Sequence, residues 1–293
     1  MRTLPSSALL AAVTGALLLI VVPAADATPQ PVVYAHRGGT EGDRTTENTL
    51  AAFEAAHQDY GASGVWLEMD TQLTGDGALV VLHDAALSET VNGNGQWTAG
   101  CAASVLDLTW AEVHECDPDV PLLADVIDRA SEDGWRLMIE IKNIPGEANF
   151  DAAGAAVATA LIDLLNDNSF TDPNRLIVQS FWPPSLIQAE ALARDAGFEL
   201  RSMLLTTSAL AGPVGLPAVA NALGAVIADI DIVAPDVRSL DLSATVVDLV
   251  HALGKEVIVW TADTEASIAT AAGWGVDGVI TNYPGRAYET LGQ

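Results

Sequence analysis

Residues 65–70 read Val-Trp-Leu-Glu-Met-Asp, a short apolar run that carries two carboxylates near its end. Runs of this length, rich in β-branched and apolar residues and bounded by Gly, Asn, Asp or Pro, are typical of strands. The run is one of eight expected strands, which are Val32–His36, Val65–Asp70, Leu137–Lys142, Leu176–Phe181, Leu200–Leu205, Ile230–Ala234, Val257–Ala262 and Gly278–Thr281. Alanine-rich segments between them predict helices at Thr49–Asp59, Leu122–Glu132, Ala152–Leu165, Pro184–Ala196, Ala244–Leu253 and Glu265–Ala272.

Strands that alternate with helices are expected to pair in parallel. Eight such units in one domain predict an α/β fold closed into a (β/α)8 TIM barrel. An open, doubly wound sheet is the alternative, but it would gather its polar groups at one switch point. Here polar residues end many strands, among them His36, Asp70, Lys142 and Thr281. This distribution favours the barrel, whose active sites lie at the carboxyl ends of the strands.

The chain is expected to consist of a removable leader and one domain. Residues 1–27 have the features of a signal peptide, because Arg2 precedes an apolar stretch and Ala25-Asp26-Ala27 suits a signal peptidase. The apolar stretch is shorter than the roughly 20 residues that a membrane anchor needs. Cleavage would leave residues 28–293 as one barrel domain. We therefore expect an exported protein, secreted or retained in the cell envelope, without stable membrane insertion.

An insertion is expected after the second strand, at about residues 71–120. The turn residues Thr74-Gly75-Asp76-Gly77 predict that Leu79–His83 folds back as a hairpin arm. The only cysteines, Cys101 and Cys116, follow within the same interval. Export to an oxidising compartment favours a disulfide between them over two free thiols.

The composition is strongly acidic, with a formal net charge of −27. Nucleic acid is a poor partner for such a surface, and anionic substrates would be repelled by it. A site for a phosphate ester must therefore supply its own positive charge. Arg37, Lys142 and a bound cation are the candidates.

Three carboxylates are expected to meet at the end of adjacent strands. Glu68 and Asp70 are two residues apart on one strand, so both side chains point to the same side. Glu140 and Lys142 repeat this spacing on the next strand of the barrel. Oxygen ligands of this kind suit one divalent cation, Mg²⁺ or Ca²⁺. The alternative is a set of structural ion pairs with Arg37 and Lys142.

Two histidines follow strand-like runs and are candidates for acid–base catalysis. His36 ends the first strand, and His83 ends the hairpin arm with Asp84 beside it. Cleavage of a phosphodiester needs a base for the nucleophile and an acid for the leaving alkoxide. Imidazole titrates near neutral pH and can serve in either role. A structural histidine is the more common case, but two at strand ends beside carboxylates favour chemistry.

Four further residues are candidates for substrate binding. Arg37 and Lys142 could hold phosphate oxygens and neutralise charge that develops on phosphorus. Glu47 precedes Asn48 and Thr49, either of which could simply cap the next helix, and it could fold back toward Arg37 or the metal. Trp260 ends the seventh strand, where it either packs in the core or contacts the carbon skeleton of a ligand.

Taken together, the motifs resemble those of the glycerophosphodiester phosphodiesterase family. The matching stretches are Ala-His-Arg-Gly (35–38), Glu-Asn-Thr-Leu-Ala-Ala-Phe (47–53), Leu-Glu-Met-Asp (67–70), Leu-Thr-Gly-Asp-Gly-Ala-Leu-Val-Val-Leu-His-Asp (73–84), Ile-Glu-Ile-Lys (139–142), Gln-Ser-Phe (179–181), Val-Trp-Thr (259–261) and Gly-Val-Ile-Thr-Asn-Tyr-Pro (278–284). Each stretch is weak alone, but their order and spacing together are specific, and they run across nearly the whole mature chain.

The resemblance implies a (β/α)8 barrel that hydrolyses deacylated phospholipids to sn-glycerol 3-phosphate and an alcohol. The family's positions fall on His36 and His83 as acid and base, on Glu68, Asp70 and Glu140 as metal ligands, and on Arg37 and Lys142 as phosphate contacts. Glu47 matches a further site position. The chain departs from the family at Thr46, where Pro is common, and at Tyr283, where Arg or Lys is common. These departures bear on substrate preference.

Two other functions are compatible with these residues. Phospholipase D-like enzymes that act on lysolipids or sphingolipids share the two histidines and the metal carboxylates. The Glu140-Ile141-Lys142 motif and the helix that begins near Thr49 favour the glycerophosphodiesterase. A catalytically inactive, exported barrel that only binds a ligand is the alternative from another class, and the presence of every expected catalytic group disfavours it.

Overall fold

The computed structural model describes residues 30–43, 46–87, 101, 103–207, 230–239 and 242–293, so the expected signal peptide and part of the expected insertion lie outside them. The described residues contain one nine-stranded sheet. Its strands are β1 (Val32–Ala35), β2 (Trp66–Leu73), β3 (Leu79–Val81), β4 (Leu137–Ile141), β5 (Leu176–Ser180), β6 (Arg201–Thr206), β7 (Ile232–Pro235), β8 (Glu256–Val259) and β9 (Gly278–Thr281). All eight expected strands are present, and β3 is the expected hairpin arm.

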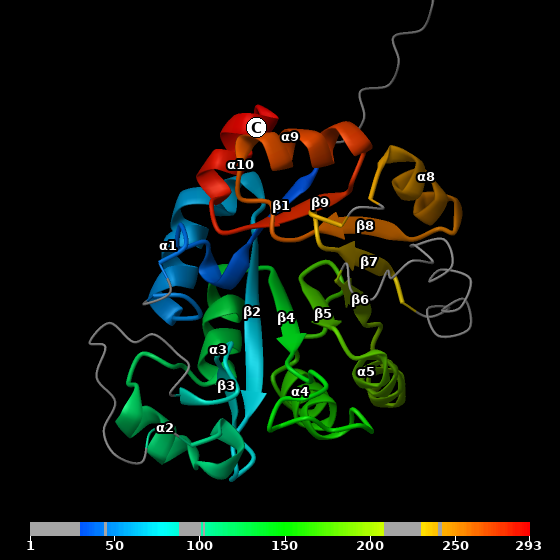
Figure 1. Cartoon of the computed structure of the whole chain (residues 1–293). Coiled ribbons are helices and arrows are strands. Elements are labelled where there is room, and N and C mark those ends of the chain that lie inside the picture. The colour runs from blue at the N-terminus through cyan, green and yellow to red at the C-terminus, as the bar shows by residue number, and fades with distance from the viewer. Residues whose placement is uncertain (1–29, 44–45, 88–100, 102, 208–229, 240–241) are drawn as a thin grey trace, which may run out of the picture.

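Eight of the strands close into a parallel barrel, which confirms the (β/α)8 TIM-barrel prediction (Figure 1). The strand order is β1-β9-β8-β7-β6-β5-β4-β2, and a pairing between β1 and β2 completes the circle. At this closure Tyr34 of β1 lies opposite Trp66 of β2 on one side and Ile280 of β9 on the other. The carboxyl ends of all eight strands therefore face the same mouth of the barrel.

Helices cover the outside of the barrel (Figure 1). The described helices are α1 (Leu50–Tyr60), α2 (Trp110–Cys116), α3 (Leu123–Asp133), α4 (Ala156–Asp167), α5 (Pro183–Ala196), α8 (Ala244–Ala252), α9 (Glu265–Trp274) and α10 (Pro284–Leu291). α2 and α10 were not expected from the sequence. α4 begins four residues later than expected, because the Asp151 carboxylate accepts hydrogen bonds from the backbone N–H groups of Ala153, Ala155 and Ala156 and holds a turn there.

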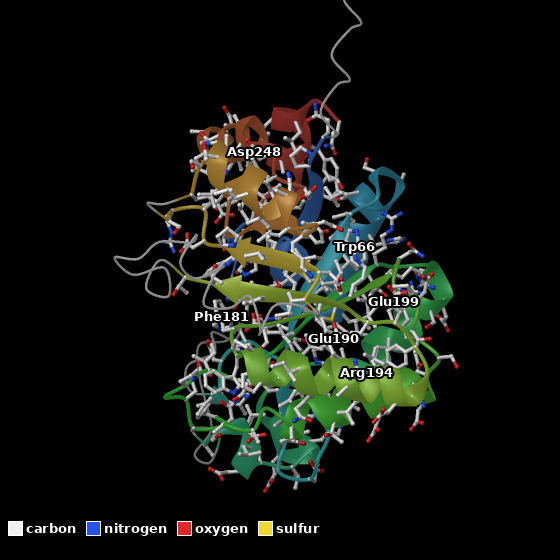
Figure 2. All side chains as sticks on the ribbon, turned by 90° about the vertical axis from the view of Figure 1, so that its right-hand side faces the viewer. Trp66, Phe181, Glu190, Arg194, Glu199 and Asp248 are labelled. Carbon is white, nitrogen blue, oxygen red and sulfur yellow. A yellow bond between two sulfur atoms is a disulfide. The ribbon has the colours of Figure 1, made fainter. Side chains whose placement is uncertain are left out.

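The barrel interior is apolar at one end and polar at the other. On β2 the inner face carries Trp66, Glu68 and Asp70 in succession, because strand side chains alternate. Trp66 belongs to an apolar cluster that fills the inside of the barrel beneath the carboxylates and reaches the mouth at Leu205 and Ile280. Its other members are Tyr34, Met138, Ile177, Met203, Ile232, Ala234 and Ile258. Figure 2 shows Trp66 and Phe181 toward opposite ends of the strands. The carboxylates therefore stand on an apolar floor and face the mouth.

The insertion is built on an extension of β2. Gln72 and Leu73 run beyond the pairing with β4, and Thr71–Leu73 pair antiparallel with β3, with Thr71 opposite Val81. A separate apolar cluster, made of Val80, Leu82, Leu87, Val105, Leu108, Val113 and Val120, lies under this arm. The expected disulfide joins Cys101 to Cys116 at the end of α2, with Cα atoms 5.7 Å apart. Within the described part of the chain, no helix has the length and apolar character needed to cross a bilayer.

Candidate active site

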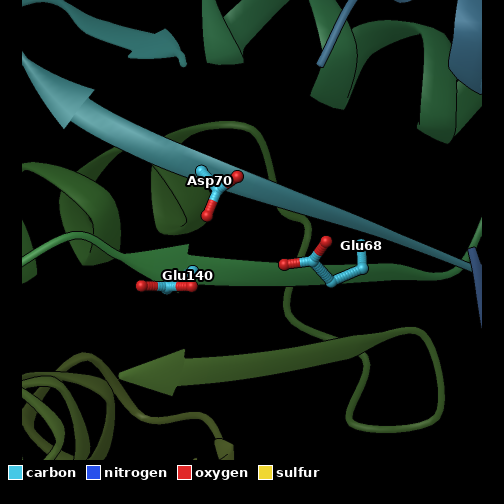
Figure 3. Close-up of side chains that lie close together, drawn as sticks. All are labelled: Glu68, Asp70 and Glu140. Carbon is cyan, nitrogen blue, oxygen red and sulfur yellow. The ribbon is translucent and has the colours of Figure 1, made fainter. Parts of the chain in front are cut away.

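Three carboxylates converge at the mouth of the barrel (Figure 3). Glu68 and Asp70 come from β2, and Glu140 comes from β4, where it lies directly opposite Asp70 in the parallel register. One oxygen of each carboxylate lies within 4.8 Å of the others. All three residues are at most 5 % exposed. The predicted convergence of these acidic side chains is therefore confirmed.

Two cationic side chains lie against the carboxylates. Lys142 Nζ is 3.2 Å from Glu140 Oε1 and 3.7 Å from Asp70 Oδ1. Arg37 Nε is 3.2 Å from Asp70 Oδ2 on the opposite side. Lys142 is itself only 2 % exposed, so this positive charge is held inside the protein. Removal of either cation would leave buried negative charge without compensation.

Burial and charge shift the protonation of the three carboxylates in different directions. Burial, reinforced by the charges of Asp70 and Glu140, raises the pKa of Glu68 well above its usual value. Burial also raises the pKa of Glu140 to about 7, although the charge of Lys142 opposes it. For Asp70, burial is outweighed by the charges of Lys142, His83 and Arg37, which lower the pKa below its usual value. The protein alone can therefore ionise only part of this cluster at neutral pH.

The donor set fits a hard divalent cation. It consists of carboxylate oxygens, which are the ligands that Mg²⁺ and Ca²⁺ prefer. Glu140 Oε1 is buried and accepts no well-aligned hydrogen bond, although Lys142 is near. A dication between the three groups would allow all of them to ionise, because it supplies the positive charge that the protein lacks there.

Two amide side chains, which were not predicted as site residues, hold the carboxylates in place. Gln179 on β5 donates from Nε2 to Glu68 Oε1 at 2.7 Å. Asn48 donates from Nδ2 to Asp70 Oδ2 at 2.9 Å, and the Asp70 backbone N–H donates to Asn48 Oδ1. Thr49, not Asn48, caps α1, since its side chain accepts from the backbone N–H of Ala52. Asn48, with φ of 59°, is thereby freed to reach the site.

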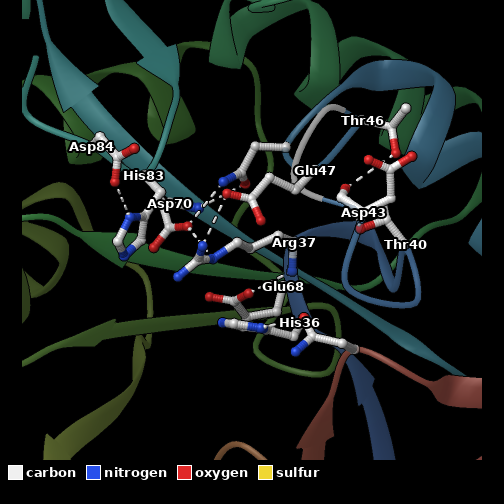
Figure 4. Close-up of polar contacts among 12 residues, drawn as sticks. His36, Arg37, Thr40, Asp43, Thr46, Glu47, Glu68, Asp70, His83 and Asp84 are labelled. Atoms are coloured by element: carbon white, nitrogen blue, oxygen red, sulfur yellow. Dashed lines mark hydrogen bonds and ion pairs between the residues drawn. The ribbon is translucent and has the colours of Figure 1, made fainter. Parts of the chain in front are cut away.

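A tight turn at the end of β1 presents Arg37 to the site (Figure 4). The turn is the 3₁₀ helix His36–Gly38, in which Arg37 has φ of 51° and Gly38 has φ of 91°. The Arg37 backbone N–H donates to Glu68 Oε2 at 2.8 Å. Its Nη1 donates to Glu47 Oε1 at 3.0 Å, so Glu47 does fold back toward Arg37, as one interpretation of the sequence anticipated.

The two histidines line one cavity of about 260 Å³ at the mouth of the barrel. His36 Nδ1 lies 2.8 Å from Asn282 Oδ1, and His83 Nδ1 lies 2.6 Å from Asp84 Oδ1. Burial and the charge of Arg37 lower the pKa of His36 to about 4, so this ring is neutral at pH 7. Each histidine is therefore held through one ring nitrogen by a polar side chain.

Gln72 fixes the end of the hairpin arm that carries His83. It lies on the same face of β2 as Glu68 and Asp70, and it is fully buried. Its Nε2 donates to the backbone carbonyl of His83 at 2.9 Å, while its Oε1 accepts from Asn149. Gln72 was not predicted as a site residue, although the i, i+2 spacing that continues along β2 from Glu68 and Asp70 could have indicated it.

The opposite wall of the cavity is apolar. Phe181 and Trp260 meet edge to face with ring centroids 5.3 Å apart, and Leu205 and Ile280 complete this wall. Trp260 donates from Nε1 to the backbone carbonyl of Ala234 at 2.8 Å, which fixes the indole ring. The cavity thus offers one charged wall for an anionic group and one apolar wall for carbon atoms.

The structure brings the predicted site residues together in one place. The cavity is lined by His36, Arg37, Glu68, His83, Glu140, Lys142 and Trp260, with Ile144, Gln179, Phe181, Leu205, Thr261 and Ile280. Asp70 lies behind this surface in contact with Arg37 and Lys142, and Glu47 contacts Arg37. The cysteines form the disulfide in the insertion rather than part of the cavity.

The known proteins that this chain is similar to include glycerophosphodiester phosphodiesterases. The sequence profile of the glycerophosphoryl diester phosphodiesterase family matches residues 36–286. A glycerophosphodiester phosphodiesterase from Bacillus altitudinis is 28 % identical over 267 residues, which cover 87 % of this chain and 96 % of that protein. A probable glycerophosphodiester phosphodiesterase 1 from Mycobacterium tuberculosis strain H37Rv is 29 % identical over 277 residues, covering 87 % and 90 %.

Solved structures of similar proteins share the fold. A putative glycerophosphoryl diester phosphodiesterase from Silicibacter pomeroyi superposes with a TM-score of 0.70 at 27 % identity, covering 90 % of this chain and 94 % of that one. A phosphodiesterase from Oleispira antarctica, solved in complex with its product sn-glycerol-3-phosphate, superposes with a TM-score of 0.71 at 23 % identity, covering 90 % and 98 %.

Proposed function

We propose, because this chain belongs to the glycerophosphoryl diester phosphodiesterase family, that it hydrolyses glycerophosphodiesters to sn-glycerol 3-phosphate and an alcohol. The observation that carries this proposal is one cavity that is lined by two histidines, two cations and two of the three clustered carboxylates. Its charged wall suits a phosphodiester, and its apolar wall suits the carbon atoms that the phosphate joins. The chain is accordingly a phosphoric diester hydrolase.

Glu68, Asp70 and Glu140 would hold one divalent cation, Mg²⁺ or Ca²⁺. A bound dication would supply positive charge for the non-bridging oxygens of the phosphate. Arg37 and Lys142 add to this charge from either side of the cluster. Because Lys142 is buried and Arg37 is tethered to Glu47, both are oriented before substrate arrives, which favours stabilisation of the transition state over simple binding.

The two histidines supply acid–base catalysis from the wall of the same cavity. One takes a proton from the nucleophile, either water or the 2-hydroxyl of the glycerol, and the other gives a proton to the leaving alkoxide. Asp84 lies 2.6 Å from His83 Nδ1 and orients the imidazole ring. The apolar corner of Phe181 and Trp260 would pack against the carbon skeleton of the substrate.

The test is release of sn-glycerol 3-phosphate from glycerophosphocholine by the chain lacking residues 1–27. We expect turnover with added Mg²⁺ or Ca²⁺ and none in excess chelator, and loss of at least about a hundredfold in His36→Ala and in His83→Ala. His251→Ala is the matched control, since His251 bonds to Asp277 and does not line the cavity. Full turnover in excess chelator would exclude the metal, and unchanged activity in both active-site variants would exclude the acid–base pair.

The same assay separates the competing functions. A lysolipid offered beside glycerophosphocholine would be the preferred substrate of a phospholipase D-like enzyme. Tight binding of either compound without turnover would indicate a barrel that only binds its ligand. We propose in addition that the protein acts outside the cytoplasm, a proposal supported by the Cys101–Cys116 disulfide, because such bonds persist in oxidising compartments. A fusion of residues 1–27 to a reporter that is active only after export would test it.

A further inference from the structure

We propose that Asp263 and Asn282 form a positioning relay, which keeps the proton of neutral His36 on Nδ1 and leaves Nε2 as the proton acceptor. The inference rests on the proposed function, since it names the atom that would take the proton of the nucleophile. Asp263 and Asn282 do not line the cavity that His36 faces, so they would act through His36 and not on the substrate.

Asp263 sets the direction of the relay, because a carboxylate accepts hydrogen bonds and donates none. Its Oδ1 accepts from the backbone N–H of Asn282 at 2.9 Å and from Thr281 Oγ1 at 3.2 Å. Its Oδ2 lies 2.8 Å from the side-chain Nδ2 of Asn282. Arg286 also donates to the backbone carbonyl of Asp263. Both oxygens of this carboxylate therefore have fixed donors.

The orientation of the Asn282 side-chain amide fixes which ring nitrogen of His36 carries the proton. Because Oδ2 of Asp263 needs a donor, the NH2 group of the Asn282 amide faces it, and the amide oxygen must face the other way. That oxygen lies 2.8 Å from His36 Nδ1 and can only accept, so Nδ1 must carry a proton. Neutral imidazole has one N–H group, which leaves Nε2 unprotonated. Among the described residues Nε2 has no hydrogen-bond partner.

An unprotonated Nε2 on the cavity wall makes His36 the base of the first step. The proton of the attacking hydroxyl moves to Nε2 as the new bond between oxygen and phosphorus forms, and His36 becomes an imidazolium. The bond from phosphorus to the leaving oxygen breaks, and that oxygen takes a proton from the imidazolium form of His83, which becomes a neutral imidazole. The relay does not change during this step, because Nδ1 keeps its own proton and continues to donate to Asn282.

Asp263→Asn is designed to reverse the relay without altering its shape. The carbonyl oxygen of the new amide would keep the backbone N–H of Asn282, so its NH2 group would occupy the place of Oδ2. Asn282 would then turn its oxygen toward residue 263 and its NH2 group toward His36. Nδ1 would have to accept, and the proton would move to Nε2. We expect kcat to fall by about 10²–10⁴-fold, as wrong-tautomer variants of catalytic histidines do, with KM changed little.

The order of effects among three variants distinguishes the relay from a merely structural role. Asn282→Ala removes the contact to His36, but an untethered ring still populates the productive tautomer part of the time, so we expect only a roughly tenfold loss of kcat. Asp263→Asn, although it does not contact His36, should thus lower kcat more than Asn282→Ala, which removes the contact to His36. Asn282→Ala added to Asp263→Asn should restore kcat to the level of Asn282→Ala alone, because nothing then forces the wrong tautomer.

Nitrogen NMR of the histidine-labelled protein reads the tautomer directly and needs no turnover. We expect a protonated Nδ1 and an unprotonated Nε2 for His36, and the reverse in Asp263→Asn, with the signals assigned through His36→Asn. The matched control is Asp277→Asn, since Asp277 also accepts from a histidine and from a backbone N–H but lies away from the cavity; its kcat should not change. A proton on Nε2 in the unsubstituted protein, or a double variant worse than either single one, would overturn the relay. A correct tautomer in a protein without turnover would overturn the proposed function alone.

Discussion

Binding of a divalent cation to the carboxylate cluster should release protons, by an amount that follows from the site. Metal ligands must be deprotonated, and Glu140, with a pKa of about 7, is half protonated at neutral pH in the metal-free protein. This group alone contributes about 0.5 proton at pH 7, and Glu68, whose pKa is also raised, adds up to about one more. We expect the metal affinity to rise at least about tenfold between pH 6 and pH 8.

Calorimetric titration of the metal-free protein with Mg²⁺ or Ca²⁺, in buffers of different ionisation enthalpy, counts the protons released. Lys142→Met should release more protons than the unsubstituted protein, because the charge of Lys142 holds down the pKa of Glu140. Glu265→Gln, which alters an exposed carboxylate on α9, should release the same number. A count of zero at pH 7, together with an affinity that is flat from pH 6 to pH 8, would show that the carboxylates are already ionised and would refute this reasoning.

Three further outcomes follow from other parts of the molecule. Replacing both Cys101 and Cys116 with serine should lower the unfolding free energy by about 3 kcal/mol in urea titrations, since the bond closes a loop of 15 residues; an unchanged midpoint would mean that the apolar cluster alone holds the insertion. The pKa of His36 falls from 6.5 to about 4 on folding, so the unfolded chain binds a proton more readily than the folded one. The free energy of unfolding of the metal-free protein should therefore fall by roughly 3 kcal/mol relative to that of His36→Asn as the pH drops from 6.5 to 4. Plots of unfolding free energy against pH that run parallel for the two proteins would contradict the low pKa. Gly38→Ala should cost about 1–3 kcal/mol by thermal unfolding and lower kcat, since the new Cβ would lie 2.7 Å from the Cβ of Ala52 and Gly38 has φ of 91°; a fully active variant of unchanged stability would show that this turn tolerates a side chain.

The barrel and its carboxylate cluster could be predicted because both depend on short-range patterns. Strands can be recognised in the sequence as apolar runs between turn residues. Eight strands that alternate with helices are compatible with few chain topologies. The i, i+2 spacing of Glu68 and Asp70 fixes their common face within one strand. Closure of the barrel then brings Glu140 beside them, since β4 is the neighbour of β2.

The residues that orient this cluster could not be predicted, because their contacts depend on register between distant segments. Gln179 meets Glu68 across 111 positions of sequence, and Asn282 meets His36 across 246. Nothing in the local pattern distinguishes either amide from one that caps a helix or faces solvent. For the same reason Asn48 was considered only as a cap of the next helix. Its left-handed backbone conformation directs its side chain to Asp70 instead.

The extension of β2 separates the catalytic centre, whose geometry must be kept, from the disulfide-bonded segment, whose length and sequence can vary. One strand carries two of the three acidic ligands and then continues outward to bind β3, and Gln72 ties the end of that arm back to the barrel. The position of His83 is therefore set before the chain enters the disulfide-bonded segment. Insertions, deletions or replacements in that segment can therefore leave the positions of the catalytic side chains unchanged. For the same reason, a binding module could be inserted there by protein engineering.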